Sequence, residues 1–351
     1  MKEITILGAG ISGLTAAINL SKAGYQINVY EIGKDCGTRF KGDLQGIENW
    51  SSKTNVLKQF KSMNIKINFE YSPFKEVIFT DGEVKNSIDL NKPLFYLVKR
   101  GSMKGSLDQA LKKQALKSGV NIKFNSTIKE SKADIIATGP KKAFGLCAGI
   151  SFETGDDNIA VFLINNDANH NCYSYLLIRN GYGCICTLLT DKFHLAQIYL
   201  NKTLDIFKNM FSIKMRNIKK VGGVCYFSLN RKFMQQNRMY VGEASGLQDA
   251  FCGFGIRSSM ISGYFASKSI LEGKDYAELM DETTSKFLKA SVVNRFIWEK
   301  IILKNPKNLI EKLEKTKNLS NLIYNVYNYS LPIQKVLYPI AISWAKKRFR
   351  Y

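Results

Sequence analysis

The sequence Gly8-Ala9-Gly10-Ile11-Ser12-Gly13 lies near the start of the chain, between a strand pattern and a helical pattern. Residues 4–8 are β-rich and apolar, and residues 14–20 carry apolar side chains at helical spacing. Residues 26–31 give a second strand pattern that ends in an acid. Strand, glycine-rich turn, helix and strand in this order form the full context of the G-x-G-x-x-G dinucleotide fingerprint. The stretch therefore predicts an α/β fold with a Rossmann-like domain and a parallel sheet.

The residues of this turn have separate physical tasks. Gly8 permits the tight turn, Gly10 lets the backbone approach a pyrophosphate, and Gly13 lets the helix lie close to the sheet. The start of the helix, with Ile11 and Ser12, presents free N–H groups and the positive end of its dipole to the phosphates. These features predict a nucleotide-binding site.

Glu31 restricts which dinucleotide fits. It lies 18 residues beyond Gly13, where a carboxylate can bind both ribose hydroxyls of an adenosine. The same negative charge would repel a 2′-phosphate, so the residues favour FAD or NAD over NADP.

A second glycine-rich motif lies far downstream. Residues 239–246 form a short apolar strand pattern followed by Gly-acid-small-small-Gly, and residues 247–257 lead into a helix with small residues at regular spacing. This arrangement resembles the second flavin motif of the FAD-dependent oxidoreductase superfamily. The resemblance implies that Glu243 accepts a ribityl hydroxyl and that the next helix presents its amides to the flavin N1/O2 edge. It favours FAD over NAD and implies these site residues: Gly242, Glu243, Gly253, Phe254, Gly255 and Ile256.

Three further segments support the same resemblance. Arg100 precedes a helix pattern in the setting where an Arg contacts FAD in p-hydroxybenzoate-hydroxylase-like flavoproteins. Residues 36–39 resemble the G-G-R found near the pyrophosphate, with Thr38 at the second glycine. Residues 133–140 match the A-T-G strand end that returns beside the first glycine turn. The resemblance thereby adds Arg39, Arg100, Thr138 and Gly139 to the implied FAD site.

The resemblance covers residues 1–275, and residues 37–50 and 242–263 are most similar to geranylgeranyl-reductase-related flavoproteins. Members of that group saturate double bonds of isoprenoid chains. The chain has Thr138-Gly139 where flavin monooxygenases and many isoprenoid reductases carry Asp-Gly. That Asp is linked to NADPH engagement in the hydroxylases, so its absence weakens a monooxygenase interpretation. The Phe-Pro substrate signature of the reductases is absent from the sequence, and Ala250 follows Asp249 where a proline is expected. No sequence feature names a catalytic residue.

The chain is expected to divide into an interleaved pair of domains and a tail. Residues 1–150 form the first part of the FAD-binding domain, within which residues 40–95 partly contribute to the substrate side. Residues 151–235 form an antiparallel-sheet substrate domain, because strand patterns alternate there with Asn- and Gly-containing loops. Residues 236–275 return to the FAD-binding domain, and residues 276–351 form a helical basic C-terminal region.

The sheet of residues 151–235 is expected to cover the flavin, and six of its residues are candidates to line the site. Core packing is the favoured interpretation of each, because aromatic and cysteine side chains are common in sheet cores. The seven cysteines do not have the spacing of a disulfide framework, so we expect reduced thiols and a cytoplasmic protein. With only two histidines and no second pair of closely spaced cysteines, we expect no metal site. The six candidates are Tyr173, Tyr175, Cys184, Cys186, Cys225 and Tyr226.

Positive charge is concentrated at the C-terminal end. The chain carries a net charge of +22. Residues 285–351 hold 14 Lys/Arg against 3 Asp/Glu, a net charge of +11, which is half of the net charge of the chain. Residues 331–345 are strongly apolar and contain Trp and Tyr, and a cationic tail follows. Such a segment is typical of an interfacial membrane anchor, but a helix packed on the flavin domain is an equal alternative. Pro332 and Pro339 predict short helical pieces rather than one helix.

The leading functional hypothesis is an FAD-dependent reductase or dehydrogenase of a hydrophobic, isoprenoid or lipid-like substrate, acting by hydride transfer through flavin N5. A single nucleotide fingerprint predicts no separate NAD(P)H domain, so electrons are expected from transiently bound NAD(P)H, from a ferredoxin or flavodoxin, or from the product side. The alternatives are a flavin-dependent monooxygenase or halogenase, a flavoprotein isomerase or cyclase, and an RNA-binding flavoprotein. An anionic membrane surface is a candidate partner, and nucleic acid is less favoured.

Overall fold

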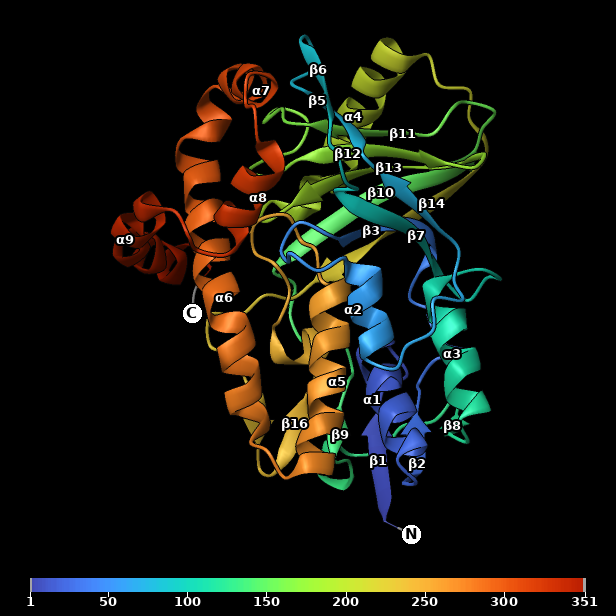
Figure 1. The fold of residues 1–351 in the computed structure, drawn as a ribbon. Helices are drawn as coiled ribbons and strands as arrows, with labels where there is room; N and C mark the ends of the chain where they lie inside the picture. Colours follow the sequence, from blue (N-terminus) through green and yellow to red (C-terminus); the bar gives the residue numbers. More distant parts are fainter. Residues whose placement is uncertain (1, 350–351) are drawn as a thin grey trace.

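A six-stranded sheet carries the first glycine turn and forms the lower layer of the computed structural model, which describes residues 2–349 (Figure 1). Its order is β15-β16-β9-β1-β2-β8, and β15 is antiparallel to β16 while the other neighbours run parallel. The predicted α/β class with a Rossmann-like parallel sheet is confirmed. The strands are β1 (Glu3–Leu7), β2 (Gln26–Tyr30), β8 (Asn121–Lys123), β9 (Ile135–Ile136), β15 (Met234–Gln235) and β16 (Arg238–Tyr240).

Helices α1 (Ile11–Lys22) and α5 (Ile256–Glu272) pack against each other beside this sheet, and α3 (Leu107–Lys117) packs on α1. The contact between α1 and α5 is close because Gly263 has no side chain. A Cβ at Gly263 would lie 2.1 Å from the carbonyl oxygen of Ser12. The small residues of α5 therefore bring the second motif next to the first.

A seven-stranded, mainly antiparallel sheet forms the upper layer (Figure 1). Its order is β14-β10-β13-β12-β11-β5-β6. The predicted domain boundary at residue 150 falls inside β10, which begins at Gly145. Residues 76–89, from the stretch 40–95 that was expected to contribute to the substrate side, also join this sheet. Hydrogen bonding between distant strands sets its limits. The strands are β5 (Glu76–Thr80), β6 (Lys85–Asp89), β10 (Gly145–Glu153), β11 (Ile159–Leu163), β12 (Ser174–Arg179), β13 (Tyr182–Leu189) and β14 (Arg216–Cys225).

Smaller elements complete these layers. Helix α4 packs on β13 and β10 of the upper sheet, with Phe207 buried beneath it. A three-stranded sheet in the order β3-β7-β4 contacts both α5 and the upper sheet. These elements are β3 (Lys41–Glu48), β4 (Tyr71–Phe74), β7 (Phe95–Gly101), α2 (Val56–Ser62) and α4 (Ala196–Phe211).

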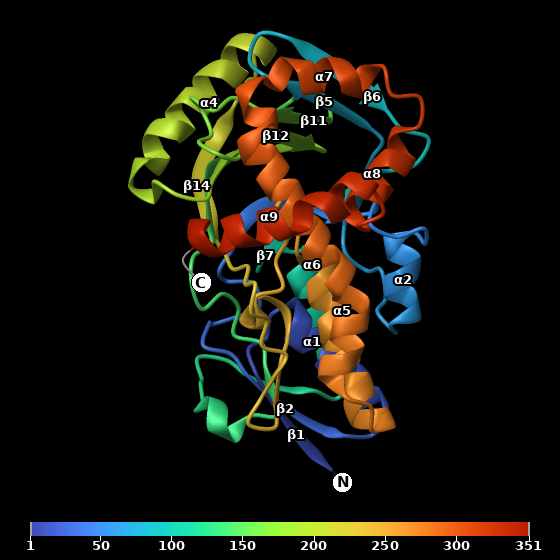
Figure 2. The ribbon, with the colours of Figure 1, turned by 90° about the vertical axis from the view of Figure 1, so that its left-hand side faces the viewer.

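The C-terminal region is helical, and its last helix crosses the face shown in Figure 2. Helix α9 is continuous, so the prediction of short pieces is wrong. Pro332 occupies the first turn, where no N–H is required, and Ala341 and Ala345 are completely buried after Pro339 and hold the helix together. The helices are α6 (Tyr276–Lys300), α7 (Pro306–Glu314), α8 (Leu319–Tyr327) and α9 (Pro332–Arg348).

The inner side of α9 belongs to a hydrophobic cluster that includes Phe144, Val292 and Val293. None of the helices within residues 2–349 is long and apolar enough to cross a membrane. The packed-helix alternative therefore describes the inner side of α9. The predicted cationic tail also includes Arg350 and Tyr351, which lie outside the described residues.

A chain of ion pairs fixes the end of α9. Arg348 donates from Nε to Glu299 Oε2 at 3.1 Å and from Nη2 to Asp191 Oδ2 at 2.5 Å. Glu299 also accepts from Nε of Arg295 at 2.9 Å, and the side chains of Arg295 and Glu299 are 1% and 5% exposed. The network joins α9, α6 and the loop after β13, so the basic charge of Arg348 has a structural role.

Arg348→Met should lower the free energy of unfolding by about 1–3 kcal/mol, because two carboxylates would lose a charged hydrogen-bond donor. Lys347→Met, on the exposed side of the same helix, is the matched control and should leave stability unchanged. Urea denaturation followed by circular dichroism measures both. Equal stability of the two variants would contradict the structural role of Arg348.

Candidate nucleotide and substrate cavity

A cavity of about 720 Å³ lies at the carboxyl ends of β1, β2 and β9 and reaches the strands of the upper sheet. All but two of the predicted FAD-site residues line it. The exceptions are Gly13 and Gly242, whose missing side chains serve packing. A Cβ would lie 2.3 Å from the Gly8 carbonyl oxygen at Gly13 and 2.7 Å from Ser12 Oγ at Gly242. The lining residues are Gly8, Gly10, Ile11, Ser12, Glu31, Arg39, Arg100, Thr138, Gly139, Glu243, Gly253, Phe254, Gly255 and Ile256.

Gly10 differs from the other glycines of the first turn. At Gly8, φ is +105° and a Cβ would lie 2.3 Å from the carbonyl oxygen of Ala137, so the protein itself requires glycine. At Gly10, φ is −73° and the nearest atom to an added Cβ is 3.8 Å away. Neither backbone strain nor packing excludes a side chain at Gly10. The space it leaves open belongs to the cavity, as expected where a pyrophosphate approaches the backbone.

Two helix N-termini open into this cavity, and both follow a glycine. Helix α1 begins after Gly10 and α5 begins after Gly255, and neither receives a side-chain cap. By contrast, side-chain oxygens cap five other helices. An uncapped N-terminus carries N–H donors and a positive dipole, so these two ends can bind acceptor groups of a ligand. The capping residues elsewhere are Asn55, Ser106, Asp275, Asn305 and Asn318.

Glu31 lines the cavity beside the first glycine turn. Its carboxylate accepts hydrogen bonds from the N–H groups of Ala9 and Gly33, both at 2.8 Å. Each carboxylate oxygen can accept more than one hydrogen bond, so these bonds orient Glu31 and leave acceptor capacity for ribose hydroxyls. Glu31 thus links the end of β2 to the first glycine turn.

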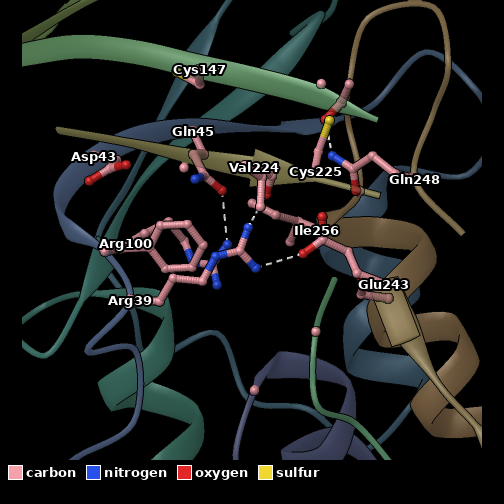
Figure 3. A pocket seen from close by; sticks show the side chains of 18 of the residues that line it. Arg39, Asp43, Gln45, Arg100, Cys147, Val224, Cys225, Glu243, Gln248 and Ile256 are labelled. Carbon is pink, nitrogen blue, oxygen red and sulfur yellow. Dashed lines mark hydrogen bonds and ion pairs between the residues drawn. The ribbon is translucent and has the colours of Figure 1, made fainter. Parts of the chain in front are cut away.

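Arg39 reaches across the other part of the cavity (Figure 3). Its Nη1 lies 2.8 Å from Glu243 Oε2, and its Nη2 donates to the carbonyl oxygen of Val224. The Arg39 side chain is 37% exposed and the Glu243 side chain 17%. The ion pair therefore joins two residues, 204 positions apart, that the sequence assigned to one cofactor.

Arg100 is held more tightly. Its guanidinium forms two hydrogen bonds with Asp108, at 2.8 and 2.9 Å, and a third with Gln45 Oε1 at 2.8 Å. Burial lowers the pKa of Arg100, but attraction to Asp108 and hydrogen bonds with it reverse this effect and raise the pKa. Arg100 is therefore a fixed positive charge in the cavity wall.

Several lining residues were not predicted from the sequence. Asp43 and Gln45 come from β3, and Arg295 comes from the helical region that was assigned to the basic tail. A sequence signal existed for Arg295, because an acid stands four residues later within an otherwise apolar stretch. Asp43 and Gln45 gave no such signal, since their place depends on the pairing of β3 with β7.

The end of the cavity under the upper sheet is apolar and aromatic. The hydroxyl of Tyr173 donates to the carbonyl oxygen of Cys252 at 2.6 Å, whereas that of Tyr175 has a weak sulfur partner, Cys147 Sγ, at 3.8 Å. Burial raises the pKa of both tyrosines well above 10. This end is lined by Phe95, Cys147, Phe162, Tyr173, Tyr175, Leu177, Leu188, Phe251 and Cys252.

The structure separates the six upper-sheet candidates. Tyr173, Tyr175 and Cys225 line the cavity, whereas Cys184, Cys186 and Tyr226 are outside its lining. Cys184 and Cys186 are buried on the same face of β13, with sulfur atoms 3.3 Å apart. Within residues 2–349, no cluster of His, Cys, Asp or Glu side chains could hold a metal ion.

Comparisons of sequence agree with the first motif. The profile of a family described as an NAD(P)-binding Rossmann-like domain matches residues 6–44. No curated protein sequence matches the chain.

Comparisons of structure extend over the whole chain. A geranylgeranyl bacteriochlorophyll reductase-like protein from Thermoplasma acidophilum aligns with a TM-score of 0.67 at 15% identity, covering 99% of this chain and 100% of that one. A flavin-dependent brominase aligns with a TM-score of 0.69 at 13% identity, covering 98% of this chain and 99% of that one. The p-nitrophenol 4-monooxygenase of Pseudomonas putida aligns with a TM-score of 0.63 at 12% identity, covering 95% of this chain and 100% of that one. The chain has the fold of the FAD-dependent oxidoreductases, as the sequence resemblance implied.

Gly10→Val should give colourless protein, because its side chain would fill the space beside the first turn without disturbing the backbone. Gly155→Val is the matched control, since an added Cβ at Gly155 also meets open space but in a loop away from the cavity lining. Absorbance at the flavin bands after purification gives the occupancy. A Gly10→Val protein that retains full flavin would show that the pyrophosphate lies elsewhere.

Glu31→Ala should raise the dissociation constant of FAD roughly tenfold to hundredfold, the expected loss for charged hydrogen bonds to ribose. Glu31→Gln keeps one acceptor oxygen, so its dissociation constant for FAD should lie between those of Glu31→Ala and the native protein. Fluorescence titration of the apoprotein with FAD measures the constants. An unchanged dissociation constant for Glu31→Ala, with circular dichroism intact, would place Glu31 outside the ribose site.

Proposed function

We propose that the protein is an FAD-dependent reductase or dehydrogenase of a hydrophobic, isoprenoid- or lipid-like substrate. The observation that carries this proposal is one continuous cavity with two chemically different ends. One end offers glycine turns, two helix N-termini and two acids, which suit a dinucleotide. The other end is aromatic and aliphatic, which suits an apolar substrate.

Bound FAD would supply hydride transfer through its N5 atom. Gly10 and the α1 N-terminus would receive the pyrophosphate, Glu31 the ribose, and Glu243 the ribityl chain. Gly255 and the start of α5 would face the flavin N1/O2 edge, where a helix dipole stabilises negative charge. The tyrosines, phenylalanines and leucines of the upper sheet would exclude water and orient the apolar substrate.

Tyr175 is the proposed proton donor. Its hydroxyl lines the cavity, and its partner is the sulfur of Cys147 rather than an oxygen. A tyrosine hydroxyl is protonated at neutral pH, and burial raises the pKa of Tyr175 well above 10, so it would donate only to a strongly basic centre such as a carbanion-like substrate carbon. Tyr173 is less suited to the role because its hydroxyl is committed to a backbone carbonyl at 2.6 Å.

A flavin-dependent oxygenase is the second candidate, because the brominase and the p-nitrophenol 4-monooxygenase share the fold. Thr138 stands where flavin monooxygenases and many isoprenoid reductases carry Asp. That Asp is linked to NADPH engagement in the hydroxylases, so its absence counts against the oxygenase and the reductase is kept as the first candidate. NADH, NADPH and reduced ferredoxin are the proposed electron donors for the reductase.

The proposed function is tested by anaerobic reduction of the purified yellow protein with each of the three donors. Lipids that copurify should be extracted and identified, and returned to the reduced protein as substrates. Loss of a double bond together with flavin reoxidation supports the reductase. Substrate-dependent oxygen consumption would support the oxygenase instead, and conversion without net use of reductant would support an isomerase or cyclase.

Tyr175→Phe should slow substrate turnover by about 10²–10⁴-fold, the usual contribution of a general acid, while flavin reduction by the donor keeps its rate. Tyr173→Phe is the matched control and should retain turnover. Stopped-flow absorbance separates the two half-reactions. Equal turnover by Tyr175→Phe and the native protein would remove Tyr175 from the mechanism.

A further inference from the structure

The outer side of α9 carries an apolar stripe that nothing in the described chain covers. Ile333, Val336 and Ile340 are 52%, 70% and 57% exposed. Their spacing of three and four residues places them along one side of the helix. The opposite side is buried through Ala341 and Ala345, so the helix is held in place while the stripe stays exposed.

Exposed basic residues lie on the same helix as this stripe. Lys335, Lys346 and Lys347 are exposed on α9, and residues 315–351 contain seven Lys/Arg and no Asp/Glu. The exposed Lys300 lies 6.0 Å from the Trp344 ring, beside the same helix. Arg348 on the same helix is already paired with Glu299 and Asp191, so the three lysines of α9 supply the exposed charge. The surface therefore combines aliphatic contact area with exposed positive charge.

We infer that the outer side of α9 docks on the surface of an anionic lipid bilayer. An interfacial helix inserts its apolar side chains below the headgroups, while its lysines contact anionic headgroups. A second copy of the chain is a poorer occupant, because a two-fold contact would oppose lysines to lysines. Nucleic acid would use the lysines but would leave the aliphatic stripe in water.

The aromatic residues of this segment have a different role from the one the sequence suggested. The ring centroid of Trp344 lies 5.5 Å from that of Phe296 and 5.6 Å from that of Phe349. Phe349 in turn packs 4.7 Å from Phe144, which lines the cavity. The Trp therefore faces the protein, and docking through the aliphatic stripe would bring the cavity wall close to the membrane. This inference goes beyond the proposed function and does not depend on bound flavin.

The test is sedimentation of the full-length protein with phosphatidylcholine vesicles that contain phosphatidylglycerol, and with phosphatidylcholine vesicles alone. The native protein should bind the anionic vesicles more strongly at low salt than at high salt. The triple variant Ile333→Gln, Val336→Gln, Ile340→Gln should lower the partition coefficient at least about tenfold. The triple variant Lys335→Gln, Lys346→Gln, Lys347→Gln should lower it by a similar factor.

Matched controls separate the α9 surface from general effects. Leu116→Gln, Ile198→Gln, Ile218→Gln removes three exposed aliphatic side chains elsewhere, and Lys113→Gln, Lys117→Gln, Lys132→Gln removes the same net charge elsewhere. Both should bind like the native protein, and circular dichroism should show all variants folded. Absent vesicle binding by the native protein, or equal losses in the controls, would overturn the inference. A dimer in sedimentation velocity that the α9 aliphatic variant dissociates would also overturn it, since the stripe would then be a subunit contact.

Discussion

The close approach of two backbone segments, at Gly8 and Ala137, determines how the two glycine motifs meet at the cavity. A Cβ on Gly8 would lie 2.3 Å from the carbonyl oxygen of Ala137, so glycine alone lets β1 and the return strand β9 end side by side. This contact places the N-terminus of α1 at the sheet edge, and the parallel pairing of β9 with β16 then brings Glu243 to the same edge. One steric constraint thus unites motifs separated by more than half of the chain.

The cavity is also fixed from its far side, by charge. Arg295 lines it and is almost fully buried, so its guanidinium must be compensated. Glu299 supplies that compensation and is shared with Arg348 on α9. The last helix is consequently part of the support of the cavity wall. The basic C-terminal region therefore has two kinds of cation. Arg348 anchors α9 to the protein, whereas Lys346 and Lys347 stay exposed.

Local spacing made the nucleotide end predictable from the sequence. Gly8, Gly10 and Glu31 lie within one strand–turn–helix–strand unit, and Glu243 follows its own strand by a fixed offset. The apolar end could not be derived in this way, because β5, β10 and β14 join one sheet only through long-range pairing. The prediction that Pro339 would break the last helix was wrong for a related reason. The rule that proline ends a helix is local, whereas burial of Ala341 and Ala345 is tertiary and outweighs it.

The two ends of the cavity differ because they come from two kinds of sheet. Parallel strands place the helix N-termini that follow them at one edge, so polar N–H groups collect there. The upper sheet is mainly antiparallel and presents one face of side chains, here Phe162, Tyr175 and Leu177. A reacting group held between the ends would meet the dipole of α5 on one side and dry aromatic surface on the other. In the proposed reductase, charge that develops on the flavin would then be stabilised by amides, while the apolar wall would keep water away from the reacting carbon.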